Sequence, residues 1–375
     1  MPNVHDLRTY GGWLELSVPA LRHNLAGVVK LTTPATVMAV VKANAYGAGA
    51  TELAGMLQAE GVSRFAVATV DEAAALREAG IDGEILCLTY FDHGDAEAIR
   101  RYDLAVTVFS PASASMLAEI ADAQGERRHA WIKIDTGLGR LGVSLGDAAT
   151  FIEAVNDDAR LAIDGVYSTL TENGERDRRQ LAALLELRTR LPALSGVLWS
   201  IASSHGILTL AGSALDVVRP GIVLLGFPPS EAHRLDAERL AVADPMPVIS
   251  WKSRVADVKT ISAGNQVGYG EQPALEHDTR VATLMTGWAD GYHGTHRSDS
   301  CVLVAGRRCA VLSLSANTTL VDVTHADSVV AGDEAVLLGR QGDVEISVEE
   351  LARTGNGVYR MLAGIPARVP RIRTN

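Results

Sequence analysis

The feature that most restricts the fold is an alternation of short apolar runs with longer amphipathic segments through the first two thirds of the chain. The short runs are rich in β-branched residues and predict strands, whereas the longer segments repeat their apolar residues at spacings of three and four and predict helices. Eight strands are expected, at residues 36–42, 64–69, 84–90, 104–110, 129–135, 161–168, 197–203 and 216–225. Helices are expected at residues 50–61, 70–80, 113–125, 147–158 and 175–191.

Eight consecutive βα units indicate the α/β class and favour a closed (β/α)8 barrel over an open doubly wound sheet. After Pro247 the pattern changes to strands joined by Gly, Asn and Asp turns, with one helix expected at 346–354. We therefore predict a barrel at 13–240 and a β-rich domain at 241–375, with residues 1–12 forming a strand that joins the second domain. The four prolines of 227–247 mark the expected boundary.

Composition excludes several classes of protein. The 34 Lys and Arg residues against 45 Asp and Glu residues give a net charge of −11, which argues against a general binder of nucleic acid or anionic membranes. Cys87, Cys301 and Cys309 lack CxxC spacing, so we expect neither a disulfide framework nor a structural zinc site. The chain has no apolar run of roughly 20 residues and no signal-peptide pattern at its start. These features predict a soluble, cytoplasmic protein.

In a barrel of this type, function gathers where strands end, because the loops there converge on one mouth. The first predicted strand ends at Lys42, within AVVKANAYGAG. A lysine desolvated at that position has a lowered pKa and suits a Schiff base with an aldehyde cofactor. The alternative is a lysine that extends out of the barrel mouth into solvent. Tyr46, in the Gly-rich turn that follows, is a candidate phosphate donor or simply a packed loop aromatic.

Three further strand ends are polar. Lys133 and Asp135 fall on one face of the fifth strand, where they form either an ion pair or a site in which one charge is modified; Arg140 follows a Gly-Leu-Gly turn. The loops after the last two strands commonly hold a phosphate, and Ser204 with the amides of Gly221 and Ile222 fit that role. Arg219, expected inside the last strand, needs a buried partner, and a ring nitrogen would serve.

These residues belong to motifs that resemble the alanine racemase family. The matching blocks are VMAVVKANAYGAG, WIKIDTGLGRLGV, VVRPGIVLLG, VGYG, GWADGY, the span from GRRCAVLSLSANTTLVDV to DEAVLLG, and YRMLAGIPARVPRI, in the family's order and near its spacing. The resemblance extends from GGWLELSVPALRHNL to RVPRI and therefore covers almost the whole chain.

The resemblance implies a pyridoxal-phosphate-dependent amino-acid racemase. Lys42 would carry the cofactor and act as one acid/base group, and Tyr269 of VGYG would be the second, supplied by the partner subunit of a homodimer. Arg219 would face the pyridine nitrogen, and Lys133, carbamylated in many members, would orient Arg140 at the substrate. The implied phosphate contacts are Tyr46, Ser204, Gly221, Ile222 and Tyr359.

The chain departs from the family around the substrate. Ala316 and Asn317 stand where the family has a Met-Asp pair, Thr169 replaces a histidine near the cofactor ring, and Leu138 replaces a common methionine. We expect a roomier, less anionic pocket that accepts a substrate larger than alanine, or one with an acidic or polar side chain. Neutral drift with compensating neighbours is the alternative. Further departures are Ala48, Trp288 and Leu225.

Two other functions remain open. A decarboxylase or an aldolase-type lyase would keep Lys42 and break a different bond, and a pyridoxal-phosphate-binding protein without turnover would not need Tyr269. We predict no metal site, because the histidines do not have the spacing of a ligand set. The histidines considered are His93, His205, His293 and His296.

Overall fold

The computed structural model describes residues 11–192, 194, 196–229, 235–293, 300–353 and 357–375, which leaves His296 outside the described chain. By their contacts these residues form two units. The barrel unit comprises Ala20–Ala45 and Leu53–Met246; the β unit comprises the described parts of Met1–Pro19, Tyr46–Glu52 and Pro247–Asn375. Within the described ranges, no helix combines the length and the apolar character needed to cross a membrane.

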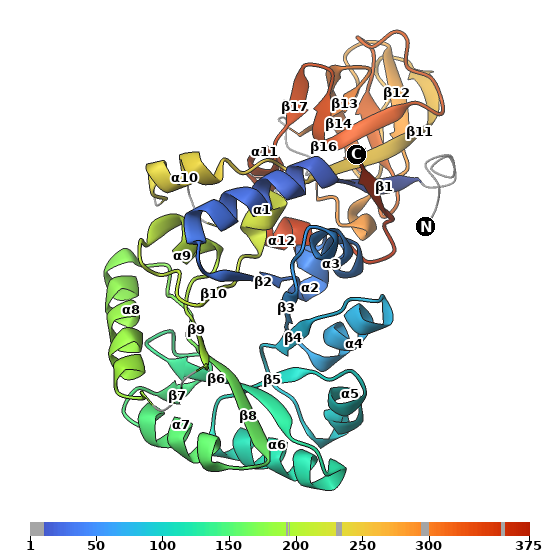
Figure 1. Cartoon of the computed structure of the whole chain (residues 1–375). Coiled ribbons are helices and arrows are strands. Elements are labelled where there is room, and N and C mark those ends of the chain that lie inside the picture. The colour runs from blue at the N-terminus through green and yellow to red at the C-terminus, as the bar shows by residue number, and fades with distance from the viewer. Residues whose placement is uncertain (1–10, 193, 195, 230–234, 294–299, 354–356) are drawn as a thin grey trace. The chain divides into compact units, whose positions relative to one another are not determined.

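The barrel unit is built on a parallel sheet in the order β10-β2-β3-β4-β5-β6-β8-β9 (Figure 1). The strands are β2 (Thr36–Val40), β3 (Arg64–Val67), β4 (Glu84–Cys87), β5 (Ala105–Val108), β6 (Arg128–Asp135), β8 (Leu161–Tyr167), β9 (Leu198–Ser200) and β10 (Val217–Val218). The short β7 (Val143–Ser144) adds to β6. A parallel bridge between Ser203 and Arg219 joins the two edges of the sheet. The predicted barrel-type fold is therefore confirmed.

The last barrel strand is shorter than the sequence suggested. The run predicted as a strand at 216–225 forms only the two residues of β10, and its apolar end folds as the 3-10 helix η3 (Ile222–Leu225). Pro220 explains the break, because proline has no backbone N–H to donate to a ladder. Arg219 consequently lies just beyond β10 and not within a strand.

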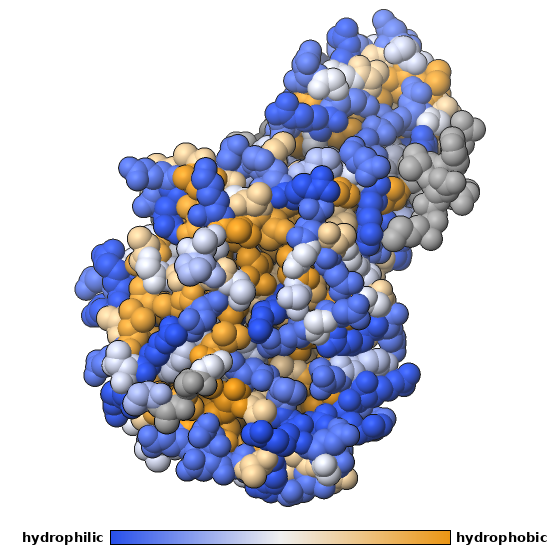
Figure 2. Space-filling view, in the orientation of Figure 1, coloured by the Kyte–Doolittle hydropathy of each residue, from blue (hydrophilic) through white to orange (hydrophobic). Residues whose placement is uncertain are grey.

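Helices surround this sheet, and all five predicted helices are present. The helices of the unit are α1 (Val18–Thr32), α3 (Ala50–Ala59), α4 (Val70–Glu78), α5 (Ala96–Arg101), α6 (Pro111–Gln124), α7 (Ala148–Asp157), α8 (Gly174–Thr189), α9 (Ser204–Thr209) and α10 (Ala237–Ala243), of which α1 and α3 begin in residues of the β unit. Local capping sets their starts: Ser110 accepts the N–H of Ser113 at the start of α6, and Pro111 occupies its first position. The side that carries α4 and α5 is mostly hydrophilic (Figure 2).

The β unit is one sheet in the order β17-β16-β13-β14-β15-β12-β11-β1-β18, with β16 also pairing with β11. Its strands are β1 (Gly12–Ser17), β11 (Ile249–Ile261), β12 (Thr279–Leu284), β13 (Cys301–Val304), β14 (Arg307–Leu314), β15 (Thr319–Asp322), β16 (Glu334–Gln341), β17 (Val344–Ile346) and β18 (Arg371–Thr374). Its helical segments are η5 (Trp288–Asp290), α11 (Val348–Arg353) and α12 (Val358–Ala363). β1 lies between β11, antiparallel, and β18, parallel. The predicted strand at 1–12 falls almost wholly outside the described residues.

Candidate active site

Lys42 lies two residues beyond β2, at the carboxyl end of a barrel strand, and is followed by an unusual turn. The φ angles of Ala43, Asn44, Ala45 and Tyr46 are 52°, 53°, 52° and 54°, so four consecutive L-residues adopt the left-handed helical conformation. This conformation costs about 1–2 kcal/mol per residue for non-glycine side chains. The surrounding structure must supply contacts that hold the turn.

Glu72, in the first turn of α4, supplies two of those contacts. One carboxylate oxygen accepts the N–H of Ala43 at 2.7 Å, and the other accepts the N–H of Ala68 at 2.7 Å. The carboxylate therefore ties the residue after Lys42 to the end of β3. Nothing in the sequence distinguished Glu72 from the other charged residues of a predicted amphipathic helix.

The environment of Lys42 favours the neutral amine. Burial lowers its pKa, and the nearby charges of Arg140 and Arg219 lower it further, whereas Glu72 raises it. A neutral Nζ is the form that attacks an aldehyde and that accepts a proton. The sequence-based expectation of a desolvated lysine at this strand end agrees with this arrangement.

Lys133, on β6, is buried with 4% exposure, and it forms no ion pair with a carboxylate of the described chain, although the charge of Asp135 raises its pKa slightly from a longer distance. Its Nζ donates to Thr169 Oγ1 at 2.5 Å and lies 4.4 Å from the centroid of the Tyr167 ring. Burial lowers the pKa of Lys133 well below its usual value, and Arg219 and Arg140 lower it further. Thr169, where the family has a histidine, is thus the direct partner of Lys133.

Asp135 does not form the ion pair with Lys133 that strand alternation left open. Its carboxylate accepts the N–H groups of Gly137 at 2.9 Å and Gly139 at 3.1 Å. Burial raises the pKa of Asp135, but hydrogen bonds from Gly139, Gly137 and Leu138 outweigh it and hold the pKa below its usual value. The carboxylate thus shapes the turn that carries Leu138 and leads to the exposed Arg140.

Arg219 is buried with 5% exposure and has three partners. It donates to Ser200 Oγ, and to the backbone oxygen of Ser168 at 2.6 Å, while its guanidinium carbon lies 4.8 Å from the centroid of the Tyr167 ring. Burial lowers the pKa of Arg219 to about 10, so the group is a cation at neutral pH. All of its observed partners are uncharged.

Ser204 and Gly221, two of the proposed phosphate contacts, already touch each other. Ser204 Oγ accepts the N–H of Gly221 at 2.9 Å and that of Val223 at 3.3 Å. Ser204 begins α9, and Ile222 begins η3. The site thus holds the Ser204 hydroxyl, itself a donor, at the start of a helical turn, a place suited to a phosphate, while the N–H groups of Gly221 and Val223 are bonded to that hydroxyl oxygen.

Within the β unit, Tyr46 and Tyr359 are in edge-to-face contact, with ring centroids 5.8 Å apart. The chain around Tyr46 is fixed by Arg371, which donates to the backbone oxygen of Gly47 at 2.6 Å. Gly47 itself cannot be replaced, because a Cβ there would lie 1.9 Å from the backbone oxygen of Leu362. The two tyrosines named from sequence are therefore brought together by a tightly packed backbone.

Tyr269 stands between two glycines of positive φ and is 81% exposed. A Cβ at Gly268 would lie 1.9 Å from Ser313 Oγ, so the residue before Tyr269 must be glycine. The backbone oxygen of Tyr269 accepts Gln272 Nε2 at 2.9 Å. The turn presents the phenol to the surface of the unit.

Ala316 and Asn317 form the tip of the hairpin between β14 and β15. Ser315 Oγ and Thr318 Oγ1, on either side of the tip, lie 2.7 Å apart. The backbone oxygen of Ala316 accepts the N–H of Ala289 at 2.9 Å, next to Trp288, which is 55% exposed. The tip is thus rigid and pinned to η5.

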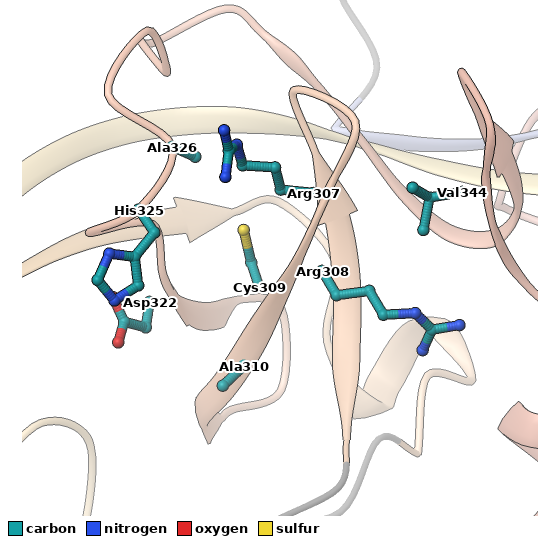
Figure 3. Close-up of a pocket in the computed structure, with 8 residues that line it drawn as sticks. All are labelled: Arg307, Arg308, Cys309, Ala310, Asp322, His325, Ala326 and Val344. Atoms are coloured by element: carbon teal, nitrogen blue, oxygen red, sulfur yellow. The ribbon is translucent and has the colours of Figure 1, made fainter.

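Asn317 also lines a cavity of about 270 Å³ within the β unit, together with Asp290 and Arg368, whose side chains form an ion pair at 2.9 Å. A second cavity of this unit, of about 500 Å³, is lined by residues of which none was named from the sequence as a site residue. Figure 3 shows Arg307 and Arg308 of β14 pointing to different sides of the strand, with the ring of His325 beside Asp322.

Several residues of the barrel site were missed by the sequence reasoning. Tyr167 and Ser168 close the strand predicted at 161–168 and could have been found by asking which side chains and carbonyls lie at its carboxyl end. Ser200 lies inside the next predicted strand. Glu72 contacts the site from a helix and left no sequence signal.

Comparison with known proteins decides the family. The family model "Alanine racemase, N-terminal domain" matches residues 16–229, and "Alanine racemase, C-terminal domain" matches residues 248–373. The chain belongs to the alanine racemase family. It is accordingly a pyridoxal-phosphate-dependent racemase, an isomerase, and the family resemblance inferred from the motifs is confirmed.

Individual relatives agree. The chain is 36% identical to the alanine racemase of Carboxydothermus hydrogenoformans and 33% identical to that of Desulforamulus reducens, in each case over 96% of this chain and 98% of the relative. Among solved structures, the alanine racemase from the D-cycloserine-producing Streptomyces lavendulae has 30% identity, a TM-score of 0.85 and 97% coverage of both chains. That of Clostridium difficile 630 has 27% identity, a TM-score of 0.90 and covers 97% of this chain and 96% of its own.

Proposed function

We propose that this racemase interconverts amino-acid enantiomers by two-base proton transfer, with Lys42 Nζ acting on one face of the substrate and the Tyr269 phenol on the other. Inversion at Cα requires a proton to leave one face and another to arrive at the opposite face, so two groups are the minimum. The observation that carries the proposal is Lys42 at a barrel strand end, where burial and the charge of Arg140 lower its pKa. Glu72 fixes the turn that aims it.

The barrel unit fits the cofactor. Of the barrel residues proposed to meet the cofactor and the substrate, Arg140 and Arg219 are cations, Lys42 carries a basic amine and Ser204 carries a hydroxyl, groups that suit an anionic phosphate and a carboxylate. Pyridoxal phosphate, when bound, supplies the electron sink that acidifies the Cα proton. Lys42 would hold it covalently, and Arg219, cationic and a donor only, would face its ring nitrogen. The phosphate would be held by Ser204, Gly221, Ile222, Tyr46 and Tyr359.

The working unit is a homodimer in which each active site receives Tyr269 from the other copy. This part of the proposal is supported by exposure: Tyr269, Trp288 and Met285 are 81%, 55% and 42% exposed on a single chain. A phenol that accepts a proton needs a desolvated and oriented setting, and large exposed apolar side chains mark surfaces that associate. We place the dimer in the cytoplasm, where the free thiols of Cys87, Cys301 and Cys309 would stay reduced.

The substrate is an amino acid: alanine, one larger than alanine, or one with an acidic or polar side chain. The small Ala316 and the uncharged Asn317, at the rigid hairpin tip, are the residues that would admit the larger side chain. Leu138 and Thr169 would line the pocket from the barrel, and Lys133, once converted to an anionic carbamate, would orient Arg140 toward the substrate carboxylate. Whether Lys133 carries a carbamate is a separate question, which its intact mass in the active protein would answer.

The test is to incubate the purified protein, loaded with pyridoxal phosphate, with each L-amino acid in deuterated water, and to analyse the products by chiral chromatography and mass spectrometry. We expect D-enantiomers that carry deuterium at Cα, with no product from the Lys42→Ala variant. Release of carbon dioxide, an aldehyde or glycine would identify a lyase instead. A cofactor-loaded protein that turns over no substrate would identify a binding protein.

A further inference from the structure

Three consecutive residues at the end of β8 hold both buried cations of the barrel unit. The ring of Tyr167 lies 4.4 Å from Lys133 Nζ and 4.8 Å from the guanidinium carbon of Arg219. The backbone oxygen of Ser168 accepts Arg219 Nη2 at 2.6 Å, and Thr169 Oγ1 accepts Lys133 Nζ at 2.5 Å. We call Tyr167–Thr169 the cation cradle.

The residues of the cation cradle hold two like charges, those of Lys133 and Arg219, which repel each other. Arg219 lies close enough to Lys133 to lower the pKa of the lysine, and the close contacts of both cations are with uncharged groups. Like charges that share a poorly solvated region separate when the groups that hold them can move. The distance between the two cations therefore depends on how firmly hydrogen bonds from neighbouring residues fix the cation cradle.

Gln180, on α8 and 3% exposed, forms hydrogen bonds that fix the cation cradle. Its Nε2 donates to the backbone oxygen of Thr169 at 2.9 Å and to Thr136 Oγ1 at 2.9 Å, and its Oε1 accepts the N–H of Thr171 at 2.9 Å. Thr136 Oγ1 in turn lies 2.6 Å from Ser168 Oγ. One amide side chain thus reaches the cradle directly at Thr169 and indirectly at Ser168.

Asp177, one turn earlier on α8, does not duplicate this role. Its carboxylate accepts the N–H and hydroxyl of Thr171 and lies 3.1 Å from His205 Nε2. These contacts fix the loop after the cradle and the start of α9. Of the two α8 residues, only Gln180 bonds to a cradle residue.

We propose that Gln180 is a positioning residue that sets the separation of Lys133 and Arg219, and through Arg219 the seat of the cofactor ring. Only the part of this inference that concerns the cofactor ring rests on the proposed function. Gln180 touches neither cation, and it meets Thr169, the one residue of the proposed pocket that it contacts, at the backbone oxygen and not at the side chain. It acts through Thr169 and through Thr136, because the bonds of its amide fix the backbone on which both cations rest.

The test compares Gln180→Met with a matched control, Gln58→Met. Gln58 also uses its side-chain amide to bind two backbone groups, the N–H of Asp82 at 2.7 Å and the oxygen of Gly80 at 3.3 Å, but it does so ahead of β4, at the amino ends of the strands. Each variant loses a side-chain amide that binds backbone groups, and the two amides lie at opposite ends of the barrel. Circular dichroism establishes that both are folded.

Two measurements report on the site, one on Lys133 and one on cofactor binding. The pH dependence of the free energy of unfolding of the cofactor-free protein, measured with urea, reports the titration of the buried Lys133. Fluorescence titration reports the dissociation constant for pyridoxal phosphate. For Gln180→Met we expect a displaced Lys133 titration and a dissociation constant raised roughly tenfold or more, as for other residues that orient a binding group. For Gln58→Met we expect both values to stay within about twofold of wild type, the range of substitutions remote from a site.

Equal values for the two variants in both readouts would overturn the proposal. If Gln180→Met does not fold, Thr136→Val decides: it cuts only the indirect link to Ser168, and a folded Thr136→Val protein with wild-type values in both readouts would also overturn the proposal. A wild-type protein that binds no pyridoxal phosphate and racemises nothing would refute the proposed function instead. The pH dependence of unfolding of the cofactor-free protein would then still test the positioning role.

Discussion

The guanidinium carbon of Arg219 lies 4.8 Å from the centre of the Tyr167 ring, and Tyr167 is only 2% exposed. The same ring contacts Lys133 Nζ at 4.4 Å. A desolvated cation on an aromatic face gains about 2 kcal/mol. One aromatic side chain thus offsets part of the cost of burying two cations that have no carboxylate in close contact among the residues the structure describes.

Replacing Tyr167 separates the role of its ring from that of its hydroxyl. Tyr167→Phe keeps the ring and loses the hydrogen bonds of Tyr167 Oη with Thr107 Oγ1 and with the backbone oxygen of Leu88, so we expect a loss of about 1 kcal/mol in the free energy of unfolding. Tyr167→Leu removes the ring from both cations, and we expect a loss of about 3 kcal/mol or more. Urea unfolding of the cofactor-free proteins measures both. Equal losses would mean that the ring contacts contribute nothing.

Glu72 is expected to control cofactor binding without touching the cofactor. Glu72→Ala leaves the N–H groups of Ala43 and Ala68 without their acceptor and releases the left-handed turn after Lys42. We expect the free energy of unfolding to fall by about 2–3 kcal/mol and the affinity for pyridoxal phosphate to fall roughly tenfold. The matched control is Glu78→Ala on the same helix, whose carboxylate binds the exposed Tyr102 hydroxyl. The same loss of affinity in both variants would contradict a specific role for Glu72.

The barrel could be predicted because each of its strands is a separate apolar run, and the motifs then located Lys42, Lys133 and Arg219. The end of the last strand could not be placed, because Val217 and Leu225 are equally apolar and only Pro220 separates the strand from the 3-10 helix. Contacts made by helix residues were also invisible. Gln180 and Glu72 are ordinary polar residues of amphipathic helices until the fold shows which backbone groups they reach.

The hydrogen-bond partner of Lys133 could not be predicted from the sequence, for a different reason. Alternation along β6 correctly placed Lys133 and Asp135 on the same strand, but it could not show that the glycine turn supplies enough N–H groups to satisfy the carboxylate. Asp135 therefore bonds locally, and Lys133 bonds to Thr169, which is 36 residues away in the sequence. Partners distant in the chain are fixed by strand order, which a single sequence does not specify.

The lowered pKa of Lys133 also predicts how the free energy of unfolding depends on pH. This pKa is well below 10.5 in the folded protein, so between the folded value and 10.5 the unfolded chain binds more protons and stability rises with pH. Lys133→Met removes this contribution. We expect the cofactor-free variant to be more stable than wild type near neutral pH, with an advantage that shrinks as the pH approaches 10.5. Urea unfolding of both proteins across pH gives the difference, and a constant difference would contradict the lowered pKa of Lys133.

Ala316 is expected to set the size of substrate that the proposed pocket accepts. Ala316→Met adds three heavy atoms at the rigid hairpin tip, so we expect kcat/KM to fall roughly tenfold or more for substrates larger than alanine and to stay near the wild-type value for alanine. Ala310→Met, on the same strand β14, is the control, and we expect it to leave both values unchanged. A uniform fall for all substrates would indicate that the tip moved, and an unchanged profile would remove Ala316 from the pocket.

The sharing of active sites between two copies can be tested with two inactive variants. Lys42→Ala lacks the cofactor lysine, Tyr269→Phe lacks the second base, and each homodimer should lose at least about 1,000-fold in kcat/KM. In a mixed dimer with shared sites, one site receives both substitutions and the other receives neither. Equal amounts exchanged to equilibrium give half mixed dimers, so racemase activity should return to about a quarter of the wild-type value. If Tyr269 instead served its own chain, every site of the mixed dimer would carry one substitution, and activity would stay at the level of the separate variants.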